Sequence, residues 1–184
     1  MDNPVNDIRR VVSELCEPDD AREMVAAVDK YFTDDARFIY PLLNSPKGSG
    51  KEGVKAAYKM LRVLSYGQKF TFHVVGFDRK SVSKGVERQK GFLDLTEHLK
   101  FKFIPLPDRL NPTFHIRFLT RVDLVKGHDD KWYIEKQEDS LPSDYGSTGL
   151  RLFPFDVEIS NFIKWVTGMG TLIVGGTLNR FNLL

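Results

Sequence analysis

The hydrophobic period of the chain changes once, near Lys69, and this change restricts the possible folds more than any other feature. Before it, apolar residues recur three and four positions apart, as on one face of a helix; after it they alternate with polar residues, as in half-buried strands. The three helical stripes are Val5, Ile8, Val12 and Leu15, then Met24, Val25, Val28 and Phe32, then Val54, Tyr58, Leu61 and Leu64. Residues 36–40 form a short strand candidate ahead of Pro41. The order predicts an α+β fold in which helices cover one face of a mostly antiparallel sheet.

One strand of the second half carries a carboxylate where a core residue is expected. Glu97 shares the apolar face of its strand with Leu95 and Leu99. Burial raises the pKa of a carboxyl group, which suits a general acid or base near neutral pH. A bulge that returns Glu97 to solvent, or an ion pair with Arg121, is the structural alternative.

An earlier strand supplies a second candidate group. Phe70, Phe72 and Val74 alternate with Thr71, His73 and Val75, which places His73 on the less apolar side. A half-exposed surface histidine is the simpler interpretation. A role for His73 beside Glu97 is kept as the catalytic alternative.

Composition excludes several classes of function. The 27 Lys and Arg residues nearly balance the 25 Asp and Glu residues, so net charge gives no case for nucleic-acid binding. The four histidines lack the spacing of metal ligands, and the glycine pairs at 48–50 and 168–170 lack the rest of a nucleotide-binding motif. No metal and no cofactor is expected.

The single Cys16 and the polar start of the chain bear on its location. One cysteine cannot form an intrachain disulfide, and the first residues lack the apolar core of a secretory signal. The expected location is therefore intracellular, either cytoplasmic or peripheral on a membrane. Cys16 is interpreted as a packing residue of the first helix.

The end of the chain differs from the rest. We predict a domain over residues 1–140, followed over 141–184 by a linker and an apolar segment that forms a C-terminal helix. The uncharged stretch between Lys164 and Arg180 is too short for a comfortable membrane span and suits an interface instead. The predicted membrane contacts are Phe162, Trp165, Met169, Leu172, Ile173 and Val174. Docking into the protein's own domain, or onto a partner's sheet, is the alternative.

Two segments resemble a known family. Residues 31–41 (YFTDDARFIYP), followed by Gly50 and a helix, resemble the nuclear transport factor 2-like superfamily, which includes ketosteroid isomerases and SnoaL-like cyclases. The run at 101–105 (FKFIP) and residues 132–139 (WYIEKQED) resemble more closely the SigF-like family of fungi with such a domain.

The resemblance implies a cone, in which N-terminal helices and a curved sheet enclose a pocket. It places the catalytic aspartate of the isomerases at Tyr40 and their second acid near Thr120, so that mechanism is not supported. The expected pocket residues are Tyr40, Tyr58, Glu97, Phe101, Phe118 and Thr120.

Three functions follow from these expectations. The first is binding of a small hydrophobic ligand, lipid or isoprenoid-like, at a membrane surface. The second is a cofactor-independent isomerase, cyclase or dehydratase that uses Glu97 with Tyr40 or His73. The third is a homodimeric interaction module. A neutral carboxyl at the pocket floor would favour the enzyme, whereas a pocket lined only by Phe and Leu would favour the carrier.

Overall fold

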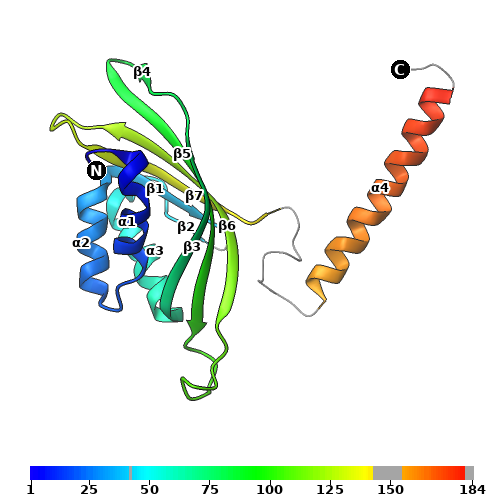
Figure 1. Ribbon diagram of the computed structural model, residues 1–184, viewed down its shortest axis with the longest axis horizontal. Helices are drawn as coiled ribbons and strands as arrows, with labels where there is room; N and C mark the ends of the chain where they lie inside the picture. The colour runs from blue at the N-terminus through cyan, green and yellow to red at the C-terminus, as the bar shows by residue number, and fades with distance from the viewer. Residues whose placement is uncertain (42, 143–154, 181–184) are drawn as a thin grey trace.

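The computed structural model describes residues 1–41, 43–142 and 155–180, except the side chains at 175, 176, 178 and 179. Among these residues two helices precede the first strand, a third follows the second strand, and a fourth comes after the last strand (Figure 1). The helices are α1 (Pro4–Cys16), α2 (Ala21–Tyr31), α3 (Gly50–Leu64) and α4 (Asp156–Arg180). The strands are β1 (Phe32–Tyr40), β2 (Leu43–Asn44), β3 (Ser65–Phe77), β4 (Ser81–Ser83), β5 (Val86–Phe101), β6 (Phe114–Lys126) and β7 (Trp132–Ser140).

The strands form one curved sheet in the order β2-β1-β7-β6-β5-β3, and β4 pairs with β5. All neighbours are antiparallel except β1 and β7, which run parallel. Helices α1–α3 lie on one side of this sheet (Figure 1). The α+β class and the cone-like arrangement are therefore confirmed.

Local signals explain where the helices begin. The Asn3 side chain accepts a hydrogen bond from the Val5 amide, and Asp20 accepts one from the Arg22 amide, so both side chains cap their helices. The Ser49 hydroxyl instead donates to the Pro46 carbonyl, and it does not cap α3.

The core lies between α1–α3 and the concave face of the sheet. Its largest fully buried side chains are Trp132, Tyr31, Phe32 and Phe38. Strand phase differs from expectation at Val74, because a register shift after Phe72 turns it outward, where it is 60% exposed. Phe103 lies beyond the end of β5 and is 68% exposed. Val5 also faces solvent on α1.

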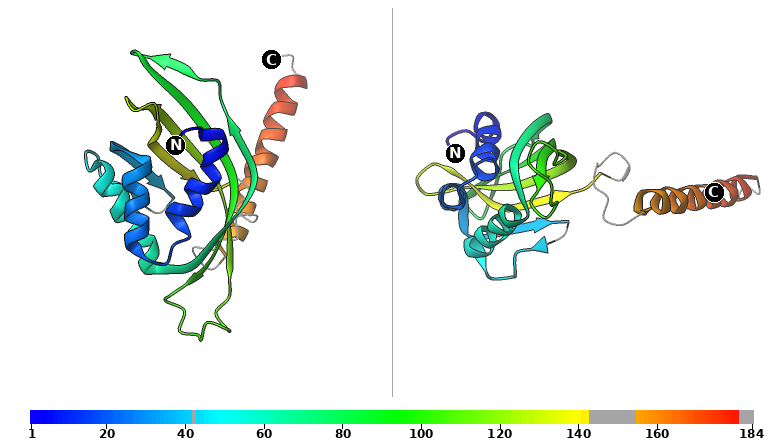
Figure 2. Two further views of the ribbon diagram at one scale, coloured as in Figure 1. Left: turned by 60° about the vertical axis from the view of Figure 1, so that its left-hand side comes forward. Right: turned by 90° about the horizontal axis from the view of Figure 1, so that it is seen from below.

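The predicted apolar C-terminal helix is present as α4. Figures 1 and 2 show it lying apart from the other helices and the sheet. From Asn161 onward, every described side chain of α4 is exposed. In the part of the chain that the structure describes, no helix has the length and hydropathy of a membrane span. Most of the predicted linker lies outside the described residues, and the boundary at 140 stays a prediction.

Candidate functional site

A cavity of about 50 Å³ lies between α1 and the concave face of the sheet. Helix α1 covers it with Ile8, Val11, Val12, Leu15 and Cys16. Most of the wall is apolar, and its polar groups come from the sheet. Two carboxylates, Glu97 of β5 and Asp139 of β7, are among these groups.

Glu97 faces into this cavity without a hydrogen-bond partner. No residue of the described chain donates to its carboxylate, and Leu95 and Leu99 flank it on the buried face of β5. Burial, and after it the charge of Asp139, raise the pKa of Glu97 to about 7, against the opposing effect of Arg62. Glu97 therefore exists in both protonation states near neutral pH.

Asp139 sits in the same cavity but is held by donors. The Thr120 hydroxyl donates to its Oδ1 at 2.6 Å, and the Gln137 amide donates to Oδ1 at 3.3 Å and to Oδ2 at 3.1 Å. Burial raises the pKa of Asp139 to about 6, and the bonds from Thr120 and Gln137 limit the rise. The two carboxyl groups thus differ in environment: one is fixed by hydrogen bonds and the other is free to meet a ligand.

Gln137 links this carboxylate to the helical layer. The Tyr58 hydroxyl of α3 donates to Gln137 Oε1 at 2.9 Å, and the Gln137 amide group then donates to Asp139. Because the Tyr58 hydroxyl occupies the amide oxygen of Gln137, the amide nitrogen of Gln137 points toward the Asp139 carboxylate. This chain of bonds fixes the orientation of Asp139 across two layers of the fold.

A β-bulge brings Asp139 into the cavity. Ile134 pairs with Leu124 of β6, but Lys136 pairs with Asp123, so β7 contains one extra residue at Glu135. Trp132 and Ile134 face the core before this residue. An extra residue reverses the alternation of a strand. As a result Gln137 and Asp139 face the cavity after it.

Tyr40 completes the polar lining at the end of β1. Its ring stacks on Phe38, with centroids 6.0 Å apart, and lies against Phe118 at 5.4 Å. Burial raises the pKa of Tyr40 above its usual range, so the hydroxyl stays protonated near neutral pH. In the described chain no partner holds this hydroxyl, which leaves it as a donor for a ligand.

The structure brings together most of the residues expected in the pocket. Phe101 is the exception: it lies away from the cavity and packs on Phe103 and Phe114. The residues that do line the cavity are Tyr40, Tyr58, Glu97, Phe118 and Thr120. That a ligand occupies this cavity stays a prediction.

His73 does not belong to this site. Its Nε2 atom lies 2.8 Å from the Thr96 hydroxyl on the outer face of the sheet. The structure therefore does not bring His73 and Glu97 together, because the two side chains lie on opposite faces of the sheet. No group of three or more potential metal ligands occurs among residues 1–41, 43–142 and 155–180.

Asp139 and Gln137 line the cavity but were not among the residues expected from the sequence. Strict alternation from Trp132 and Ile134 points both residues to solvent, and only the bulge reverses this direction. The sequence does contain one indication of the bulge. Glu135 and Lys136 are consecutive charged residues, as expected where two neighbouring side chains both face outward.

Comparison with known proteins gives the family. The chain matches the family described as the SigF NTF2-like domain over residues 1–183. The protein belongs to this family. No curated protein matches the chain closely enough to count as a relative.

Solved structures of NTF2-like proteins share the fold of this SigF-like chain. One is an NTF2-like superfamily protein from Salmonella enterica, with a TM-score of 0.54 and 14% identity, covering 75% of this chain and 87% of the other. Another is a hexachlorocyclohexane dehydrochlorinase of type 2, with a TM-score of 0.50 and 12% identity, covering 73% and 82%. At these identities the likeness shows the fold alone.

Proposed function

We propose that this SigF-like protein binds a small, largely apolar molecule in the α1-covered cavity and exchanges a proton with it through Glu97. One observation carries the proposal: a carboxyl group with a pKa of about 7 faces an apolar cavity, and no residue of the described chain forms a hydrogen bond to it. A passive carrier of hydrocarbon has no need for such a group, because burying it costs folding free energy. Proton transfer near neutral pH does need it.

The second carboxylate and the tyrosine suit the same chemistry. The Glu97 carboxylate takes a proton from a carbon atom of the ligand. The electron pair left behind either moves within the ligand, after which Glu97 returns the proton to another atom, or expels a leaving group. The first outcome is an isomerisation and the second an elimination. Tyr40 is the donor placed to stabilise an oxygen that gains charge.

One solved structure of the same fold supports this class of reaction. One protein of the same fold is a dehydrochlorinase by name, and removal of hydrogen chloride is an elimination. The fold itself hosts unrelated functions, so the argument rests on Glu97 and its surroundings.

The cavity size restricts the ligand. A volume of about 50 Å³ holds roughly three or four water molecules. Pockets for drug-sized ligands measure roughly 300–1,000 Å³. A whole lipid or isoprenoid chain therefore does not fit the cavity as it stands. The side chains of α1 must move outward before a ligand of more than a few atoms can enter. This favours a small substrate over the lipid carrier.

Hydrogen–deuterium exchange tests the proposal without a known substrate. The protein is incubated in D₂O with a panel of small apolar ketones and enones, and deuterium uptake is followed by mass spectrometry. Glu97→Gln should slow exchange by roughly 10²–10⁴-fold, the usual contribution of a general base. Glu87→Gln, on the same strand but outside the cavity, is the matched control.

The outcome can also contradict the proposal. Equal exchange by the wild type, Glu97→Gln and Glu87→Gln would show that Glu97 has no role. Uptake of a compound in native mass spectra, with no exchange by any variant, would instead support the carrier.

We further propose that α4 contacts a membrane surface. Its side chains from Asn161 to Val174 are all exposed, among them Trp165 at 63% and Leu172 at 69%. Apolar residues on every side of a helix need a partner. Lys164 beside Trp165 suits the polar–apolar boundary of a bilayer.

A further inference from the structure

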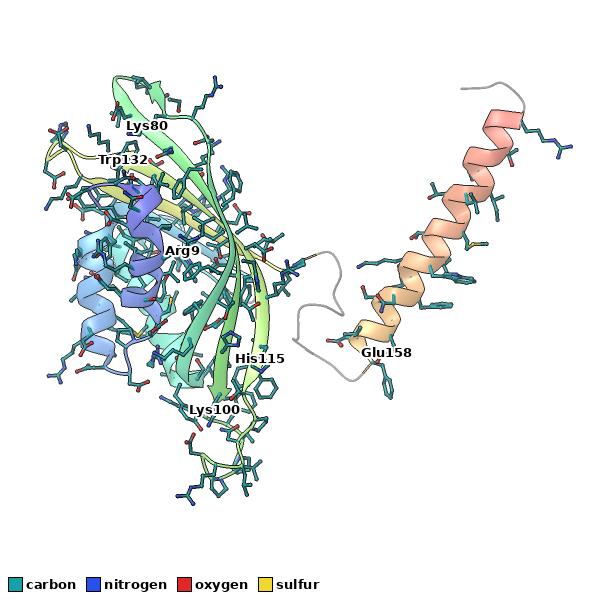
Figure 3. The ribbon with its side chains drawn as sticks, viewed as in Figure 1. Arg9, Lys80, Lys100, His115, Trp132 and Glu158 are labelled. Atoms are coloured by element: carbon teal, nitrogen blue, oxygen red, sulfur yellow. The ribbon has the colours of Figure 1, made fainter. Side chains whose placement is uncertain are left out.

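We propose a second membrane contact in the β5–β6 loop, at three apolar side chains that we call the apolar tip: Phe103, Leu106 and Leu110. They are 68%, 47% and 68% exposed, although each is large and apolar. The loop projects beyond the end of the sheet, with Lys100 at its base (Figure 3). We infer that the tip inserts into the surface of a bilayer that contains anionic phospholipid.

The loop is held in one shape, so the exposure of the tip is built into the fold. The buried Asn111 side chain donates to the Phe101 carbonyl and to the Tyr66 hydroxyl, both at 3.0 Å. Tyr66 in turn donates to Asp108 at 3.0 Å, and Lys100 bonds Asp108 at 2.9 Å. A loop fixed at both ends in this way presents its apolar residues without a cost in chain entropy when it binds.

Positive charge surrounds the tip. Between positions 100 and 110 the chain carries Lys100, Lys102, Asp108 and Arg109. Lys100 neutralises Asp108, which leaves the charges of Lys102 and Arg109 in excess. The Lys102 ammonium donates to the Arg62 carbonyl at 2.7 Å, and in the described chain Arg109 forms no ion pair. Cations around an apolar tip match the headgroups of an anionic bilayer.

A bilayer fits this surface better than a folded protein does. The tip is convex and narrow, and Pro105 and Pro107 stiffen it. A stable protein contact buries roughly 800 Å² on each side and needs a broad surface. Apolar side chains at an interface need to enter only about 5–10 Å into the headgroup boundary.

The loop is linked to the cavity through Arg62. This buried residue receives Lys102 on its carbonyl, and its guanidinium donates to the Cys16 carbonyl at the end of α1. Cys16 lines the cavity. A bilayer at the tip would therefore lie at the end of the molecule where α1 finishes.

Vesicle sedimentation of the full chain tests the proposal. The probes are vesicles of phosphatidylcholine, with and without phosphatidylserine. The variant Phe103→Ser with Leu110→Ser should lower the apparent partition coefficient about tenfold or more, because two apolar side chains no longer leave water. Val82→Ser is the matched control, since Val82 is 70% exposed on β4 at the opposite end of the sheet (Figure 1).

A charge variant tests the lipid specificity. Arg109→Glu should weaken binding to vesicles that contain phosphatidylserine and leave binding to neutral vesicles unchanged. All these positions are exposed, so thermal unfolding of the variants should match the wild type.

Three results would overturn the proposal. The first is that the wild type does not bind vesicles, and the second is that the double variant binds them as well as Val82→Ser does. The third is that the double variant has a lower oligomeric state than the wild type in sedimentation velocity without lipid, which would assign the tip to contact with a second copy of the chain. None of these results affects the exchange test of Glu97, so the proposal for the tip and the proposal for Glu97 can fail independently.

Discussion

At the scale of residues, the site depends on two carboxyl groups in unlike surroundings. Asp139 has three hydrogen bonds from Thr120 and Gln137, whereas Glu97 has none from the described chain. The inward direction of Glu97 was predictable, because unbroken alternation along β5 places it between Leu95 and Leu99. The inward direction of Asp139 was not predictable, because it depends on the bulge of β7, which leaves no unambiguous pattern in the sequence.

The raised pKa of Glu97 predicts a specific dependence of stability on pH. The folded protein keeps the Glu97 proton up to about pH 7, while the unfolded chain releases it near its ordinary value of 4.5. Folding therefore loses free energy as pH rises between these values. Glu97→Gln removes this loss, and it should stabilise the protein by about 3 kcal/mol at pH 8 but little at pH 4.5.

Urea unfolding from pH 4.5 to pH 8 measures this difference. Glu87→Gln should follow the wild-type curve, because Glu87 lies outside the cavity. A constant offset between Glu97→Gln and the wild type at every pH would mean that the carboxyl group titrates normally.

At the scale of elements, sequence periodicity located the helices and strands well but not the faces of every strand. Alternation holds along β6, from Phe114 through Ile116 and Phe118, since its ladder with β5 has no shift. It fails in β3 after Phe72, where a register shift turns Val74 outward. Shifts of this kind depend on how neighbouring strands pack, which one sequence does not reveal.

Strand β7 supplies a prediction about stability. Trp132 is 2% exposed, and the Lys80 ammonium lies 5.3 Å from the centre of its ring. Figure 3 shows both residues at the end of the sheet away from the loop of the apolar tip. Trp132→Ala should cost about 3–5 kcal/mol of unfolding free energy through the cavity it leaves.

The other tryptophan provides the control. Trp165 is 63% exposed on α4, so Trp165→Ala should change the unfolding free energy by less than about 0.5 kcal/mol. Equal effects of the two substitutions in chemical denaturation would contradict the packing of β7.

At the scale of the whole molecule, the two parts of the chain differ in kind. The domain of α1–α3 and the sheet has a buried apolar core and exposes apolar residues at places such as the apolar tip, whereas α4 exposes all of its apolar side chains from Asn161 to Val174. Composition predicted an apolar final segment, and the structure confirms a helix.

Tryptophan fluorescence distinguishes the membrane contact of α4 from that of the apolar tip, which has no tryptophan. Addition of phosphatidylserine-containing vesicles should shift the emission to shorter wavelength as Trp165 leaves water, because Trp132 is already buried. Trp165→Phe should abolish the shift. A shift that follows protein concentration, without vesicles, would assign α4 to contact between chains.

The bulge at Glu135 affects how related chains are to be aligned. Between Trp132 and Asp139 the backbone irregularity, and not the chemical type of the residues, decides which carboxylate faces α1. A relative of the same length without the bulge would present Lys136 and Glu138 inward, whereas a relative that lacks both the bulge and residue 135 would still turn Gln137 and Asp139 inward by regular alternation from Ile134. A one-residue gap at Glu135 in an alignment is therefore compatible with an intact inner acid pair.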